Sequence, residues 1–197
     1  QAEDGTTGAM FQYQSPNVDV MGWLIERVTG EPLVDFIRHN IWAPLGAEHD
    51  GVFTTDVSFA PIATGGFNST LRDAARFGLM ALNDGCLGQT QIAPESWIKD
   101  TYALQDADLA AGAASVNADA EHERFIDGFS GYRSFWWQFD AAQGERVAMG
   151  VHGQVIYVNR AKNLVIANFA SPQTTANQLR PTFKQMLAGT RALAASF

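Results

Sequence analysis

The sequence predicts an α+β fold in which helices come first, an antiparallel meander follows, and a last helix covers the sheet. Three observations support this order. Apolar residues recur at helical spacing between residues 18 and 103, short aromatic and β-branched runs separated by polar turns occupy residues 133–169, and helical spacing returns after residue 179. The chain has 197 residues, of which 46% are hydrophobic and 17% charged. This composition supplies enough apolar surface for a core and excludes a disordered chain.

Two helices are expected in the first part of the chain. The apolar spacing over residues 18–29 predicts a helix with Asn17 as its N-cap and Gly30 as a left-handed C-cap. Pro32 fits the first turn of a second helix, which we expect to end near Ile41.

Two further helices follow. Thr70 and Asp73 resemble a capping box at the start of a helix over residues 70–84. Its apolar face is expected to hold Leu71, Ala75, Gly78, Leu79 and Leu82. Pro94 opens a shorter helix that ends near Ala103.

The character of the chain changes after this helix. Residues 105–127, rich in Ala, Asp and Gly, predict a long surface excursion. Four strands are then expected at residues 133–139, 147–151, 155–158 and 164–169, with a polar hairpin loop at 159–163 before the last one. We therefore divide the chain into a helical region, residues 1–127, and a C-terminal region of antiparallel strands and a closing helix, residues 128–197.

Composition and residue spacing exclude several classes of function. With 13 basic and 21 acidic residues the net charge is −8, which argues against binding to a nucleic-acid backbone. The single cysteine, Cys86, excludes an internal disulfide, and the four histidines are not at metal-ligand spacing. No Gly-rich phosphate loop follows a strand, so neither a metal nor a cofactor is expected. The longest apolar runs are too short to span a membrane, so we expect a soluble protein, cytoplasmic or periplasmic.

A tyrosine ahead of the first helix is the first candidate for chemistry. Tyr13 lies in the polar loop of residues 11–17, next to the positive end of a helix dipole. A tyrosine in such a place can act as a general acid or base. The alternative is a loop tyrosine whose ring fills the edge of the core.

Two other features have a structural alternative, which is the commoner explanation of such patterns. Four aromatic residues close to one another could line a substrate pocket or belong to the sheet core: Tyr132, Phe135, Trp136 and Trp137. One literal Ser-x-x-Lys match joins Ser96 to Lys99, with the spacing that brings an amine against a hydroxyl across one helical turn. The spacing is better explained by two polar residues at the margin of a buried helix face, because Trp97 and Ile98 look like that face.

Several blocks of the sequence together resemble the serine β-lactamase and penicillin-binding superfamily. They are FQYQSPNVDVMGWLIERVTGEPLVDFI, ATGGFNSTLRDAARFGLMALNDG, PESW and GVHGQVIYVNRAKNLVIANFAS. The blocks occur in the family's order and cover most of the chain. They look most similar to the class C-like branch, which includes esterases and 6-aminohexanoate-dimer hydrolases. The resemblance implies a β-lactamase-like fold, in which helices and a helical region flank an antiparallel sheet, present here as a C-terminal portion.

The resemblance also implies roles for individual residues. Tyr13 would be the catalytic tyrosine, and Ser15 the third residue of its motif, next to the substrate. The third family motif fits in two registers, Ala148-Met149-Gly150 or His152-Gly153-Gln154.

We prefer the first register of the third motif. There, the N–H of Val151 stabilises the oxyanion from an edge strand, and Gly150 lets the substrate approach the backbone. Gly150, His152 and Trp136 are then expected to contact the substrate. No lysine or histidine would hold the cationic position of the motif.

In the family, Ser-x-x-Lys precedes the tyrosine motif, so here it would lie ahead of Gln1. We therefore expect a missing N-terminal segment of the same protein as a partner, and an inactive chain without it. The implied activity is hydrolysis of a small-molecule amide or ester, such as a linear aminohexanoate oligomer, through an acyl-enzyme. The alternative is a catalytically silent binding or sensing module with the same fold.

Overall fold

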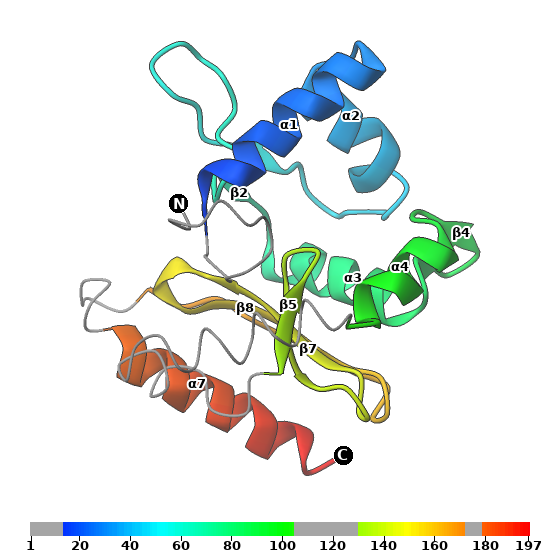
Figure 1. Ribbon diagram of the computed structural model, residues 1–197, viewed down its shortest axis with the longest axis vertical. Coiled ribbons are helices and arrows are strands. Elements are labelled where there is room, and N and C mark those ends of the chain that lie inside the picture. Colours follow the sequence, from blue (N-terminus) through cyan, green and yellow to red (C-terminus); the bar gives the residue numbers. More distant parts are fainter. Residues whose placement is uncertain (1–13, 105–129, 172–178) are drawn as a thin grey trace, which may run out of the picture.

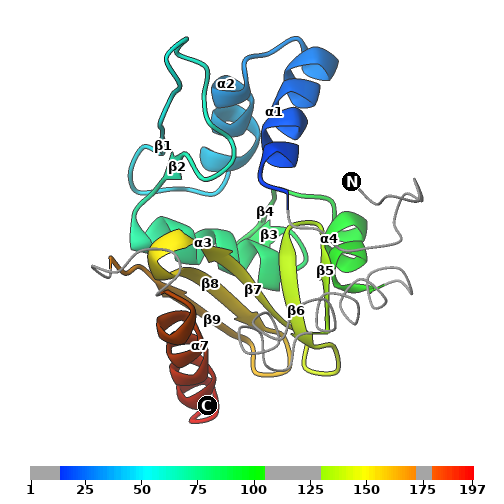
Figure 2. The same cartoon turned by 60° about the vertical axis from the view of Figure 1, so that its left-hand side comes forward.

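A five-stranded antiparallel sheet forms the centre of the structure, a computed structural model that describes residues 14–104, 130–171 and 179–197 (Figure 1). Its strands, in both spatial and chain order, are β5 (Gly131–Arg133), β6 (Trp136–Asp140), β7 (Glu145–Gly150), β8 (Gln154–Asn159) and β9 (Leu164–Asn168). Helix α3 (Leu71–Leu82) covers one face and α7 (Leu179–Ala194) the other (Figure 2). The predicted α+β order and the closing helix are confirmed.

Alternation along the strands builds one core on each face of the sheet. On β8, Val155 and Tyr157 pack with Leu187 of α7, whereas Val158 packs with Leu82 of α3. Because side chains alternate with a period of two, a shift of one residue would exchange the two faces. The expected hairpin loop between the last two strands is confirmed, since Asn159 pairs with Leu164.

The first predicted strand, 133–139, is wrong as a single element. The chain reverses within it, and Arg133 pairs with Trp136 across a two-residue turn. Ser134 and Phe135 adopt φ values of 50° and 67°, the left-handed conformation that tight hairpin turns require. Sequence reasoning missed the turn because neither residue is the Gly or Asn that usually signals it.

In the described residues ahead of the sheet there are four helical segments. They are α1 (Pro16–Thr29), α2 (Leu33–Ile37), which continues as a π-helical turn η1 (Arg38–Trp42), α3, and α4 (Glu95–Tyr102). Gly30 ends α1 with φ 71°, as expected, but α1 begins at Pro16, so Asn17 lies inside the helix. Two small hairpins were not predicted: β1 (Val52–Phe53) with β2 (Phe67–Asn68), and β3 (Cys86–Leu87) with β4 (Thr90–Gln91). Strands of two residues have no periodicity to detect.

Two surfaces of this fold are open. One side of α1 carries five large apolar side chains that are 44–76% exposed: Val20, Met21, Trp23, Leu24 and Val28. Among the described residues, β9 pairs with β8 only, so its outer side presents unpaired backbone groups. The predicted boundary at residue 127 and the predicted excursion lie outside the described residues. No helix in the described ranges is long and apolar enough to cross a membrane.

Candidate active site

The structure describes the predicted tyrosine motif only from its second half, because Tyr13 lies outside the described residues. Ser15 is exposed at the start of α1, and its side chain makes no capping hydrogen bond. Its carbonyl accepts a hydrogen bond of 2.5 Å from the Thr64 hydroxyl, and the Thr64 N–H donates to Asp19 Oδ1 over 3.0 Å. The start of α1 is therefore tied to the loop that contains Thr64.

This loop explains the Gly-Gly pair of the block ATGGF. A Cβ atom on Gly66 would lie 2.2 Å from the Ile62 carbonyl and 2.7 Å from Thr54 Oγ1, so a side chain cannot fit there. The Gly66 carbonyl accepts a hydrogen bond from the Thr54 N–H over 2.9 Å. Glycine lets the two backbone segments approach each other, and the loop holds Thr64 against α1.

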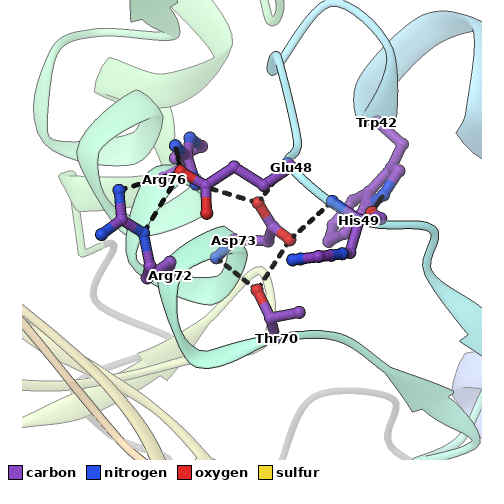
Figure 3. Close-up of polar contacts among 7 residues, drawn as sticks. All are labelled: Trp42, Glu48, His49, Thr70, Arg72, Asp73 and Arg76. Atoms are coloured by element: carbon purple, nitrogen blue, oxygen red, sulfur yellow. Dashed lines mark hydrogen bonds and ion pairs between the residues drawn. The ribbon is translucent and has the colours of Figure 1, made fainter.

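Asp73 fixes the start of α3 (Figure 3). Its carboxylate is fully buried and accepts hydrogen bonds from the Thr70 hydroxyl over 2.7 Å and from the backbone N–H of Glu48 over 2.8 Å. Arg76 forms an ion pair with it at 3.0 Å. The Asp73 N–H donates to Thr70 Oγ1, so the predicted capping bond at the N-terminus of α3 is confirmed. The network also reaches the chain after η1, which the sequence pattern did not indicate.

The charge of Asp73 is stabilised within this network. Burial alone would raise the pKa of the carboxyl, but hydrogen bonds from Thr70, Glu48 and His49 and the charge of Arg76 outweigh burial and lower the pKa. A buried carboxylate with this many donors makes a rigid joint between two segments. We therefore assign Asp73 a structural role rather than a catalytic one.

Helix α3 connects the Asp73 network at its N-terminus to the sheet. A Cβ atom on Gly78 would lie 2.6 Å from Val165 Cγ1 and 2.9 Å from Ile156 Cγ2, so the helix lies close against β8 and β9. The chain leads from the Thr64 loop through β2 into α3, and α3 packs on the strands. These connections place the start of α1 relative to the sheet.

The predicted third motif lies where β7 turns into β8. Gly150 and Gln154 form the last pair of the ladder, and Val151, His152 and Gly153 make the turn. Val151 is 72% exposed. In both views the turn lies at the end of the sheet above which α1 begins (Figures 1 and 2).

The donor was expected on an edge strand. β7 pairs with β6 only as far as Val147, so among the described residues its last part, including Gly150, is paired on the β8 side alone, and Val151 lies in the turn beyond the strand. The left-handed backbone at His152 and Gly153 follows the end of the ladder at Gly150. Gly150 and Val151 are therefore exposed at this end of the hairpin.

Trp136 is buried in the core beneath α3. Its ring stacks on Phe77 at a centroid distance of 6.5 Å, and the guanidinium carbon of Arg146 lies 4.2 Å from its centroid. The structure thus gives Trp136 the core role that the sequence left open as an alternative.

The fully buried Arg146 is a residue that sequence reasoning missed. Its guanidinium lies between the rings of Tyr102 and Trp136, at 3.6 Å and 4.2 Å from their centroids, and donates to Thr101 Oγ1 over 2.6 Å. Burial lowers the pKa of Arg146 to about 10. The available signal was its place on β7, two positions before Ala148, which puts both on the α3 face.

The literal Ser-x-x-Lys match lies on α4. Ser96 is exposed, and the half-exposed Lys99 ammonium forms an ion pair with Glu95. A lysine that acts as a base for a serine must be desolvated and directed at the hydroxyl. The structure therefore supports the alternative of two polar residues at the margin of a helix. Within the described ranges, no group of three or more His, Cys, Asp or Glu residues could hold a metal ion.

The sequence matches a known protein family and a curated relative. Residues 1–188 match the family described as beta-lactamase. The chain is similar to the 6-aminohexanoate-dimer hydrolase of Paenarthrobacter ureafaciens, with 33% identity over 170 residues. The match covers 85% of this chain and 41% of that protein, so the chain spans less than half the length of this curated relative.

Solved structures share the fold. A Bacillus anthracis protein assigned as a 6-aminohexanoate-dimer hydrolase matches with a TM-score of 0.75 and 29% identity, over 93% of this chain and 44% of that one. A Bacteroides dorei protein assigned as a beta-lactamase gives 0.64 and 20%, over 93% and 59%. EstCE1, described as a hydrolase with promiscuous acyltransferase activity, gives 0.62 and 16%, over 91% and 56%. The last two likenesses show the fold alone, and together the matches confirm the expected β-lactamase-like fold.

Proposed function

The chain belongs to the beta-lactamase family, and from that premise we propose that the complete protein is a serine hydrolase that cleaves an amide or ester bond through an acyl-enzyme. The observation that carries the proposal is the exposed turn at Gly150 and Val151, at the end of the sheet above which α1 begins. A backbone N–H at such a turn can donate to an oxyanion, while a tyrosine in that loop can exchange a proton with the reacting group.

The proposed reaction proceeds in two steps. The hydroxyl of a serine adds to the substrate carbonyl carbon, and its proton passes to the neutral lysine of the Ser-x-x-Lys motif. The oxyanion accepts a hydrogen bond from the Val151 N–H, and the C–N or C–O bond breaks as Tyr13 donates a proton to the leaving group. Water then attacks the acyl ester and gives a proton to the Tyr13 phenolate, and the serine oxygen leaves with the proton held by the lysine, which releases the acid and restores all three groups.

We place the nucleophile on an N-terminal segment of the same protein. Ser96 begins the only Ser-x-x-Lys match of this chain, and it comes after Tyr13 rather than before it. Two observations support a segment that packs here: the exposed apolar side of α1, and the unpaired outer side of β9. On this proposal the 197-residue chain does not hydrolyse substrate alone.

The proposed substrate class is a small amide or ester, and a linear aminohexanoate amide is the first to test. The 33% identity to a 6-aminohexanoate-dimer hydrolase supports this choice. Ser15 and Gly150 are the proposed contacts with the substrate; both are exposed, Ser15 at the start of α1 and Gly150 at the last pair of the β7–β8 ladder. The second candidate is a catalytically silent module, which the open α1 surface alone would equally fit.

Replacement of one hydroxyl group tests the proposal. In the complete protein, Tyr13→Phe should lower kcat for ester and amide hydrolysis by about 100-fold or more, because it removes the proton donor and keeps the ring. The matched control is Tyr157→Phe, which removes a hydroxyl from the core beneath α7 and should leave kcat unchanged. Unchanged hydrolysis in Tyr13→Phe would overturn the role of Tyr13, and a complete protein without hydrolysis would favour the silent module.

A further inference from the structure

The turn between β7 and β8 contains a strained residue that the proposed mechanism does not yet use. His152 has φ 62° and ψ 20°, which is the left-handed conformation, although it carries a side chain. The next residue, Gly153, also has a positive φ of 84°. Left-handed backbone is unfavourable for residues other than glycine, and among those it is more common for asparagine, aspartate and histidine.

Contacts from β8 and β9 keep the backbone next to His152 in this conformation. Asn168 Nδ2 donates to the Gly153 carbonyl over 3.0 Å, and Gln154 Nε2 donates to the Ala170 carbonyl over 2.6 Å. A Cβ atom on Gly153 would lie 3.1 Å from Ala170 Cβ, so the chain after His152 also lies close to the end of β9. These contacts hold the backbone that follows His152, and the chain reverses its direction at His152 itself.

The other side of the turn has no such fastening in the described residues. Val151 lies beyond the last ladder pair and is 72% exposed, and Gly150 before it has no side chain. The ladder holds Gly150 before the turn and Asn168 holds Gly153 after it, so the turn closes only if the backbone of Val151 takes a direction that matches the conformation at His152. Strained non-glycine residues that persist in folded proteins cluster at active sites, where they hold a group in one direction.

We propose that His152 is a positioning residue that acts through its left-handed backbone, and not through its imidazole, to aim the Val151 N–H at the oxyanion. The inference rests on the proposed function, in which that N–H stabilises the transition state. A donor that points away from the oxyanion stabilises the transition state less but changes binding of the substrate little. The effect is therefore expected in kcat rather than in KM.

Three variants of the complete protein separate backbone from side chain. His152→Gly and His152→Asn remove the imidazole but adopt the left-handed conformation readily, so kcat should stay within about threefold of the parent value. His152→Val also removes the imidazole, but a β-branched residue disfavours this conformation. It should lower kcat by about tenfold or more with a smaller change in KM, and it should lower the urea midpoint of unfolding relative to His152→Gly.

The outcomes distinguish this inference from the proposed function. If all three variants lose kcat equally, or if His152→Gly and His152→Asn lose the acidic limb of the pH–rate profile, the imidazole acts and the inference is overturned. Full activity of His152→Val overturns it as well. Measured in the same series, a parent protein without hydrolysis, or an unaffected Tyr13→Phe variant, overturns the proposed function and this inference with it. A Tyr13-dependent parent with equal losses overturns this inference alone.

Discussion

At the scale of single residues, Asp73 shows how one buried charge joins segments that are distant in sequence. Its carboxylate receives the N–H groups of Glu48 and His49, which lie 25 and 24 residues away along the chain. The spacing of Thr70 and Asp73 predicted the local cap. The contact with Glu48 could not be predicted, because nothing in a local pattern records which distant backbone donor a carboxylate will meet.

Asp73→Asn should therefore cost stability in a pH-dependent way. Because the folded pKa of Asp73 is lowered, the stability from its charge is present above the unfolded pKa of about 3.9 and is lost as pH falls through the folded value. We expect the variant to lose about 2–4 kcal/mol of unfolding free energy at pH 7, and the difference to shrink below about pH 4. Urea unfolding at pH 7, 5 and 3.5 measures it.

The exposed Asp50 offers a control, because Asp50→Asn should change the free energy of unfolding by less than about 0.5 kcal/mol. A loss in Asp73→Asn that stays constant from pH 7 to pH 3.5 would contradict the role given to the charge.

At the scale of elements, α3 was predicted correctly in extent but only partly in orientation. Gly78 and Leu82 of the expected face are buried, but Leu71 and Leu79 are 46% and 37% exposed. Ala74 and Ala81, which were not expected there, are buried. Periodicity locates large apolar residues, but here the small residues face the sheet because they let the helix approach β8 and β9. The absence of a side chain at Gly78 lets α3 lie close against the sheet.

A glycine-to-alanine pair tests this packing. Alanine is ordinarily the better helix former by about 1 kcal/mol, so Gly189→Ala in α7, where a Cβ meets nothing within 4 Å, should stabilise the protein by about 0.5–1 kcal/mol. Gly78→Ala should instead destabilise it by about 1–3 kcal/mol, because its Cβ would overlap Val165 and Ile156. Opposite signs in urea unfolding are expected. A gain in both variants would show that α3 does not depend on close approach.

At the scale of the whole molecule, the order of elements was predictable because each carries its own period, caps and turns. Helix, meander and closing helix followed from residue spacing alone. The hairpin at Ser134 and Phe135 and the buried Arg146 did not, since a left-handed turn without glycine and a guanidinium between two rings arise from contacts across the sheet. The connection from Ser15 through the Thr64 loop and α3 to β8 and β9 likewise exists only in the folded chain. The candidate site was thus predictable as motifs, but not as an arrangement.

The central claim is that the complete protein works through an acylated serine. It is tested most directly by mass spectrometry of the complete protein, quenched during turnover of a p-nitrophenyl ester. The account predicts a single acyl group on the serine of a Ser-x-x-Lys motif upstream of Tyr13, and none on the 197-residue chain alone. An acyl group on Ser96, or turnover without any acylated serine, would contradict it.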